Sequence, residues 1–181
     1  MRTRVLTCIG VVAVVGSVGL AQAPSAPKPG PEQKAMAFFA GKWTSQGELK
    51  PGPMGPGGPM TGADTCEWFA GGFQIVCRGE GKGPMGSMKS LGVIAYSAAD
   101  KAYSFYGIDS FGGSELSTGN KVGDTWTFTA TSSYGGQTFK SRYTIVQTSP
   151  TSYNFKWESS PDGTAWTTLM EAKATKVTTS S

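Results

Sequence analysis

Few residues in this chain are of types that carry chemistry, and the most informative are two cysteines. The chain has 181 residues and no histidine, which excludes Ser-His-Asp and Cys-His catalysis, imidazole zinc sites and the usual general base at neutral pH. Cys66 and Cys77 stand on either side of Gly71-Gly72. A Gly-Gly pair supplies the positive φ angles of a tight turn, so the flanking runs are expected to form an antiparallel hairpin.

The register of this hairpin follows from its centre. With the two glycines at the turn, Cys66 lies opposite Cys77, and Trp68 lies opposite Ile75 on the same face. Opposed strand residues have Cα atoms about 4.5 to 5.5 Å apart, a separation that a disulfide tolerates. We therefore predict a Cys66–Cys77 disulfide on the buried face, which removes both thiols as nucleophiles.

Carboxylates are the remaining candidates for acid–base chemistry. Outward or turn positions are predicted for Glu67, Glu80, Glu158, Glu171, Asp124 and Asp162. Only Asp109, in phase with Tyr103 and Phe105, is expected to point into the interior. General acid–base catalysis needs a second positioned group, and glycoside hydrolysis needs a pair of carboxylates. The sequence therefore predicts a protein that is not an enzyme.

Two Gly-Pro-Met-Gly segments place methionines in neighbouring loops. They contain Met54 and Met85, with Met60 and Met88 close by. Thioethers are soft ligands that favour Cu(I), so four of them at one rim could hold that ion. The Gly and Pro spacers favour the other interpretation, an adaptable apolar lid with no metal and no cofactor.

The first 23 residues have the composition of a secretory signal peptide. Arginines at positions 2 and 4 precede an apolar run at 5–20, and Ala21-Gln22-Ala23 is a small-residue cleavage pattern. The run is shorter than the roughly 20 residues of a membrane span, so an uncleaved anchor is the less favoured alternative and the mature chain is expected to have no span. We expect export, to the periplasm or the medium. Residues 24–31 (PSAPKPGP) then form a Pro-rich tether.

Charge composition argues against nucleic-acid partners. The formal net charge of the chain is +4, and loss of the two leader arginines would bring it to about +2, with the other basic residues scattered. The remaining length suits one domain, predicted at 32–176, with a disordered tail at 177–181.

The domain is predicted to be all-β. A short helix is expected at 32–40, and from Trp43 onward apolar residues recur at every second position. In the last such run, Trp166, Met170 and Ala172 share the apolar face. We place strands near 43–50, 62–70, 73–80, 88–96, 101–109, 114–121, 124–132, 137–147, 151–159 and 165–175.

About ten antiparallel strands joined by hairpins favour an up-and-down β-barrel over a two-sheet sandwich. The loops after even-numbered strands are short and lie at the end where the helix arrives, which predicts a plugged base. The loops after odd-numbered strands are longer and rich in Gly, Pro and Met, which predicts an open mouth. The residues expected to line a ligand site there are Met54, Met85, Phe105, Asp109, Phe111, Tyr134 and Trp157.

Several short motifs resemble a known family. Residues 38–43 (FFAGKW) are similar to the opening of lipocalin-like, or calycin, barrels. Together with CEWF at 66–69, GGF at 71–73, YGID at 106–109 and FKWE at 155–158, they make the region of about 35–176 resemble an uncharacterised exported bacterial family, domain of unknown function 1579. The resemblance implies a calycin-type barrel and brings no known activity.

Two departures limit what this resemblance carries over. Lipocalins usually place an arginine late in the chain over the first-strand tryptophan, and here only Lys173 or Lys176 is near. Haem-binding relatives with ten-strand barrels use a histidine ligand, which this chain lacks, so a haem site is not implied.

Two functions of different classes are compatible with these patterns. The first is an exported, lipocalin-like barrel that binds a small, largely apolar molecule through its mouth. The alternative is a structural or protein- or glycan-binding module of the cell envelope with a filled barrel, as the tether and the Ser/Thr-rich exterior would suit. The Cu(I) site is a third and less favoured reading.

Overall fold

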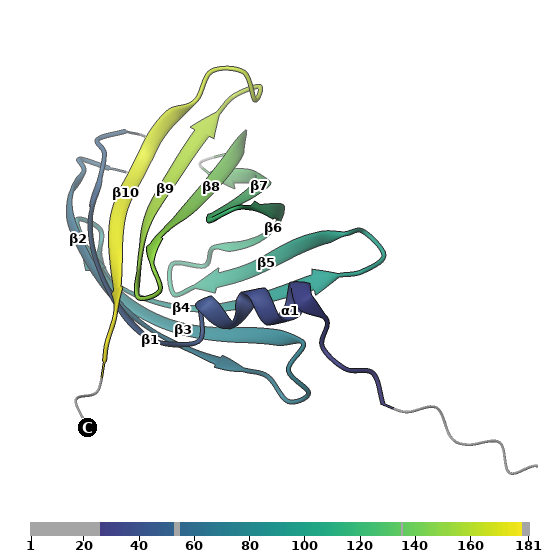
Figure 1. Cartoon of the computed structure of the whole chain (residues 1–181). Helices are drawn as coiled ribbons and strands as arrows, with labels where there is room; N and C mark the ends of the chain where they lie inside the picture. The colour runs from purple at the N-terminus through teal and green to yellow at the C-terminus, as the bar shows by residue number, and fades with distance from the viewer. Residues whose placement is uncertain (1–25, 53–54, 135, 179–181) are drawn as a thin grey trace, which may run out of the picture.

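The computed structural model describes residues 26–52, 55–134 and 136–178, and their main chain is almost entirely β-structure (Figure 1). A short helix comes first, formed by α1 (Pro31–Ala35) and a 3-10 turn, η1 (Met36–Phe38). The strands are β1 (Gly41–Leu49), β2 (Gly58–Trp68), β3 (Gln74–Gly83), β4 (Gly86–Ser97), β5 (Ala102–Asp109), β6 (Ser114–Val122), β7 (Thr125–Tyr134), β8 (Gln137–Ser149), β9 (Ser152–Ser160) and β10 (Thr167–Lys176). These bounds agree with the predicted strands to within a few residues.

The strands close into a single barrel. Each strand pairs antiparallel with its neighbours in sequence, and β1 pairs with both β2 and β10. In Figure 1, β10 accordingly lies beside β1. The predicted all-β, up-and-down barrel is confirmed.

The predicted hairpin is present with its predicted register. Cys66 pairs with Cys77 and Trp68 with Ile75, and the two sulfurs form a disulfide with an S–S distance of 2.06 Å. Both turn glycines have positive φ, +92° and +75°. Ile75 is fully buried as expected, but Trp68 is 38% exposed. Because β2 ends at Trp68, this side chain lies at the rim of the barrel rather than among the interior residues.

The helix plugs one end of the barrel, which we call the base. Met36 and Phe39 are buried in one cluster with Ile75 and Trp126, and the rings of Phe39 and Trp126 meet edge to face with centroids 4.9 Å apart. The Tyr103 hydroxyl donates a hydrogen bond to a carbonyl of α1, 3.2 Å away. Figure 1 shows α1 lying across this end of the strands. The predicted plugged base is therefore present.

Trp43 connects the helix to the first and last strands. Its indole nitrogen donates a hydrogen bond to the Phe39 carbonyl, at 2.8 Å. The Lys176 ammonium lies 4.8 Å from the centroid of the Trp43 ring and donates a hydrogen bond to the Phe38 carbonyl, at 3.0 Å. Lys176 thus takes the place over the first-strand tryptophan for which lipocalins use an arginine, whereas Lys173 lies on the outer wall.

Replacing Lys176 with methionine should lower the free energy of unfolding by about 1 to 2 kcal/mol, because it removes a charge-assisted hydrogen bond and a cation–π contact but keeps the apolar stem. Lys176→Arg should retain most of the stability. The measurement is urea unfolding followed by tryptophan fluorescence. Lys173→Met, on the same strand but facing outward, is the matched control, and equal losses from the two methionine variants would contradict the assigned contact.

Removing the disulfide should destabilise the fold in a defined order. The two cysteines are only 11 positions apart, so loop-closure entropy contributes at most about 3 kcal/mol. Cys66 lies in the core cluster, so a double Ser variant also buries hydroxyls, whereas a double Ala variant leaves a small void. We expect thermal stability to fall from oxidised wild type to double Ala to double Ser, measured by calorimetry. A double Ser variant as stable as the wild type would refute the buried placement.

Candidate functional site

The interior of the barrel beyond the base is the lumen, and it differs in composition from the base. Alternation along the paired strands directs one residue in two toward it. The inward residues of the base are large and mostly buried, whereas those of the lumen are mostly half-buried. Water therefore reaches the lumen from the end opposite the helix, where the predicted mouth loops lie.

One wall of the lumen contains a strip of glycines. It is formed by Gly62 on β2, Gly79 and Gly81 on β3, Gly92 on β4 and Gly107 on β5, which are paired or adjacent in the sheet register. Glycine is depleted in strand interiors because it leaves nothing to pack. Neighbouring side chains cover four of these glycines, because a Cβ atom at any of the four would lie within 3 Å of Ser45, Asp64 or the Phe105 ring. A Cβ atom at Gly81 would have no side chain within 4 Å, so the space left on this wall is at Gly81.

Asp64 lies on this wall. It pairs with Trp43 on one side and Gly79 on the other. A Cβ atom at Gly79 would overlap the Asp64 carboxylate and approach the Ser90 hydroxyl to 2.6 Å, so only glycine leaves the carboxylate its place. Burial raises the pKa of Asp64. Burial and then the Asp64 charge raise the pKa of Tyr153.

The opposite wall is aromatic. On β8 and β9, the Tyr143 ring stacks near-parallel with Trp157 at a centroid distance of 5.7 Å and with Phe155 at 6.3 Å. The Trp157 indole donates a weak hydrogen bond to the Ser141 hydroxyl, at 3.4 Å. These three stacked rings lie on the lumen side of their strands beside a small number of polar groups, a composition typical of small-molecule sites.

A second inward carboxylate, Glu115, borders the aromatic wall. It accepts a hydrogen bond from the Ser132 hydroxyl, which is also within 2.6 Å of the Ser141 hydroxyl. Burial is the main cause that raises the pKa of Tyr143, and the Glu115 charge adds to it. Glu115 therefore lies near the Tyr143 phenol in a hydrogen-bonded cluster.

The structure brings two of the predicted site residues onto the lumen wall. Phe105 packs its ring over Gly92 and Gly107, and Trp157 belongs to the aromatic wall. Asp109 holds its own loop instead, because it accepts hydrogen bonds from the main-chain nitrogens of Phe111 at 2.8 Å and Gly113 at 3.0 Å.

The other predicted site residues lie toward the mouth or cannot be placed. Phe111 is 53% exposed and Met85 is 43% exposed, both in loops at the end away from the helix. Tyr134 ends β7, but its side chain is not described, and Met54 lies outside the described residues. Met60 and Met88 face the lumen by their register opposite Gly47 and Gly81. The Cu(I) hypothesis stays a prediction.

Asp64 and Glu115 were missed by the sequence analysis, which expected Asp109 alone to face inward. The signal for Asp64 was available, since it lies two residues before the buried Cys66 on the same strand. Glu115 is likewise two residues before the buried Ser117. On the same face, Glu115 lies between Gly113 and Ser117, and Asp64 follows Gly62, so hydrophobic alternation does not mark either position.

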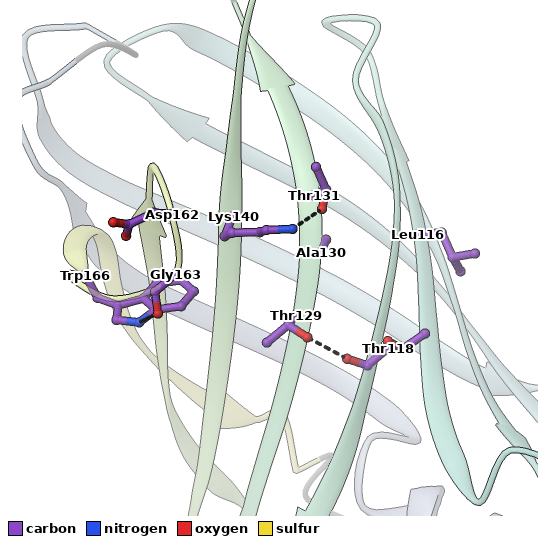
Figure 2. A pocket seen from close by; sticks show the side chains of 9 residues that line it. All are labelled: Leu116, Thr118, Thr129, Ala130, Thr131, Lys140, Asp162, Gly163 and Trp166. Atoms are coloured by element: carbon purple, nitrogen blue, oxygen red, sulfur yellow. Dashed lines mark hydrogen bonds between the residues drawn. The ribbon is translucent and has the colours of Figure 1, made fainter.

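Two hollows lie on the outer wall of the barrel. The first, of about 460 Å³, is bordered by outward residues of β6, β7 and β8 and by the loop between β9 and β10 (Figure 2). Its lining residues are Leu116, Thr118, Thr129, Ala130, Thr131, Lys140, Asp162, Gly163 and Trp166. The second, of about 650 Å³, lies over the outer faces of β1, β10, β9 and β8.

The position of Trp166 corrects the expectation that it shares the inner face with Met170. The register shifts between Thr168 and Met170, and a bulge of this kind reverses which face the preceding residues occupy. Trp166 therefore lies outside, where its ring is 4.1 Å from the Arg142 guanidinium and its indole donates to the Gly163 carbonyl, as Figure 2 shows.

The described residues hold neither a candidate metal cluster nor a membrane-spanning helix. They contain no group of three or more His, Cys, Asp or Glu residues placed to hold a metal ion. In the same part of the chain, no helix has the length and apolar character needed to cross a membrane.

The raised pKa of Asp64 predicts a specific pH dependence of stability. Because the folded-state pKa lies above the ordinary value, the folded protein binds the extra proton, and stability falls as pH rises from the ordinary pKa of about 3.9 through the raised one. Asp64→Asn should therefore match the wild type near pH 3 and be more stable at pH 7, as measured by thermal unfolding.

The outward Glu67→Gln, on the same strand, is the matched control for Asp64→Asn and should show no such crossover with pH. An Asp64→Asn variant that is less stable than the wild type at pH 7 would mean that the carboxylate has a stabilising partner.

Two solved structures share this barrel. Rv2717c from M. tuberculosis gives a TM-score of 0.60 at 11% sequence identity, with 82% of this chain and 99% of that chain covered. The S-type phycobiliprotein lyase CPES from Guillardia theta gives a TM-score of 0.52 at 13% identity, with coverages of 83% and 93%. At these identities the likeness shows the fold alone.

Sequence comparison with curated proteins finds no match. A family model does match, over residues 28–176, and it is described as "Protein of unknown function (DUF1579)". This match spans most of the chain and includes the helix, all of the strands and both walls of the lumen. The chain therefore belongs to the DUF1579 family.

Proposed function

We propose that this protein is an exported, lipocalin-like binding protein that holds a small, largely apolar molecule in its lumen. The observation that carries the proposal is the pairing of a glycine wall with an aromatic wall. The first leaves room at Gly81, and the second supplies three stacked aromatic rings. A barrel of ten strands is wide enough to enclose a ligand when its inner side chains are small.

The two ends of the barrel support the same function. The base is closed by α1 and a buried aromatic cluster, so a ligand would enter at the other end. There the loops carry Met85 and Phe111, which are exposed apolar residues suited to contact with a ligand as it enters.

We favour binding over catalysis. One protein with this fold is named a lyase, so the fold itself is compatible with either. Of the three inward carboxylates, Asp109 is engaged by the main chain of its own loop, and the other two stand on β2 and β6, four strands apart in the barrel order. Paired acid–base work requires groups on either side of one reacting bond, and each of these carboxylates lies among different neighbours.

Native mass spectrometry of the protein purified from its own host tests the proposal. The expected result is an added mass that solvent extraction removes. Gly81→Leu should fill the lumen and abolish the added mass, since a side chain at Gly81 would meet only the Thr61 carbonyl, at 3.2 Å from Cβ. Lys82→Leu adds a leucine to the outer face of the same strand and should leave the added mass unchanged.

Thermal unfolding of both leucine variants must show a folded barrel for this comparison to count. A wild-type protein with no added mass, whose lumen also takes up no compound in solution, would defeat the binding proposal.

A second candidate function is suggested by the first outer hollow. It combines an aromatic ring, Trp166, with hydroxyl, ammonium and carboxylate groups from Thr129, Lys140 and Asp162, a set that suits a polar partner such as a glycan of the cell envelope. Binding to glycan arrays that is lost in Trp166→Ala and kept in Trp157→Phe would favour this candidate. The reverse pattern would favour the lumen.

A further inference from the structure

The charge of the lumen is opposite in sign to the net charge of the whole chain. Its inward carboxylates are Asp64, Glu115 and Asp109, of which Asp109 is engaged by its loop. Among the described residues, the inward basic side chains are Lys121 and Lys176. Both lie at the base, where they bond to main-chain carbonyls. The lumen above the base is therefore acidic in a chain whose formal net charge is +4.

Some acidic residues of the outer wall have cationic partners. Glu158 is bonded by Arg142 at 2.9 Å and by Lys156 at 3.0 Å, and Lys50 lies 2.6 Å from Glu48. Within the described residues, by contrast, no side chain donates a hydrogen bond to Asp64 or forms an ion pair with it. Burial is the only cause that raises the pKa of Asp64. A half-buried carboxylate without a partner is unfavourable for folding.

We propose that the molecule held in the lumen is an organic cation: an apolar body, preferably with an aromatic ring, that carries a protonated or quaternary amine. The proposal rests on the function proposed above and specifies the chemical class of its ligand. The amine would take the position beside Asp64 that no residue of the chain compensates. The apolar body would lie against the aromatic wall.

The aromatic wall suits such a ligand for a second reason. The face of an aromatic ring carries the negative part of the ring quadrupole, which attracts cations as well as apolar groups. Tyr143 stacks with both Trp157 and Phe155, so these two are the rings that can offer a face to a cation. Glu115 stands at the edge of the same wall, near Tyr143. A cation therefore meets favourable groups on both walls, whereas an anion of the same shape meets carboxylates on both.

Three compounds with one aromatic body and different charges test this inference. They are 1-naphthylmethylamine, 1-naphthylmethanol and 1-naphthoic acid, which near neutral pH are cationic, neutral and anionic. The readout is the set of indole N–H signals of ¹⁵N-labelled protein, titrated with each compound. The Trp157 signal reports on the lumen, the Trp166 signal on the outer hollow and the Trp126 signal on the base.

The expected result is a shift of the Trp157 signal with the amine at a concentration at least about tenfold lower than with the alcohol, and little shift with the acid. Asp64→Asn should weaken binding of the amine by about tenfold or more and leave binding of the alcohol unchanged. The outward Glu67→Gln should change neither. Glu115→Gln should weaken binding of the amine by a smaller factor, because the Ser132 hydroxyl already donates a hydrogen bond to Glu115.

The outcomes separate this inference from the function on which it rests. Equal binding of all three compounds at Trp157, or preference for the acid, would overturn the inference and leave a lumenal binding protein. A shift confined to Trp166 would overturn it in favour of the outer hollow. If no compound moves the Trp157 signal and protein from the host carries no extractable mass, the lumenal function fails and the inference fails with it.

Discussion

The indole of Trp43 holds the two ends of the domain together, and the rest of the barrel depends on it. Its hydrogen bond to Phe39 fixes the end of the helical segment against β1, and Lys176 covers its ring from β10. The base cluster can close only if the helix lies in this position. Because the base is closed by side chains of the helix, the inner faces of the strands need not fill the barrel along its whole length, and the lumen can be lined by small residues.

The lumen is built at a cost to stability. Five glycines lie on its inner wall in strand interiors, where glycine weakens a strand, and among the described residues no side chain bonds to the half-buried Asp64. Local choices that oppose folding are expected where a protein serves a function. The base is more completely buried, with fully buried Met36, Ile75 and Trp126, although the Trp126 indole nitrogen has no hydrogen-bond partner among the described residues. The base therefore contributes more to the stability of the fold than the lumen does.

The hairpin and the barrel could be predicted because each follows from period-two alternation and local turn chemistry. Cys66 and Cys77 fall opposite each other once Gly71-Gly72 is placed at the turn. The order of the strands follows because every connection is a hairpin. These features depend on residues that are close together in the sequence, so the sequence alone predicts them.

The lumen was harder to predict, because its features depend on exceptions to alternation. Trp166 does not lie on the predicted inner face, because the bulge before Met170 exchanges the inner and outer faces for the residues that precede it. Asp109 has inward parity, but its carboxylate binds the main chain of its own loop, a common behaviour of Asp at turns. Asp64 was recognisable only by counting from Cys66, and the glycine wall only by aligning four strands side by side.

Closure of the barrel by its first and last strands has a consequence for how the chain acquires its structure. The contacts that close it are very distant in sequence, since Lys176 binds the Phe38 carbonyl across 138 positions. A ribosome delivers β1 first and β10 last, so one edge of β1 has no partner until synthesis of the domain is complete. Such an edge can pair with other chains. The outer face of β1 carries the polar residues Lys42, Thr44, Gln46 and Glu48. These side chains keep one side of the unpaired edge polar. The domain can therefore reach its native state only after translation has passed β10, and the nascent chain has to stay unaggregated until then.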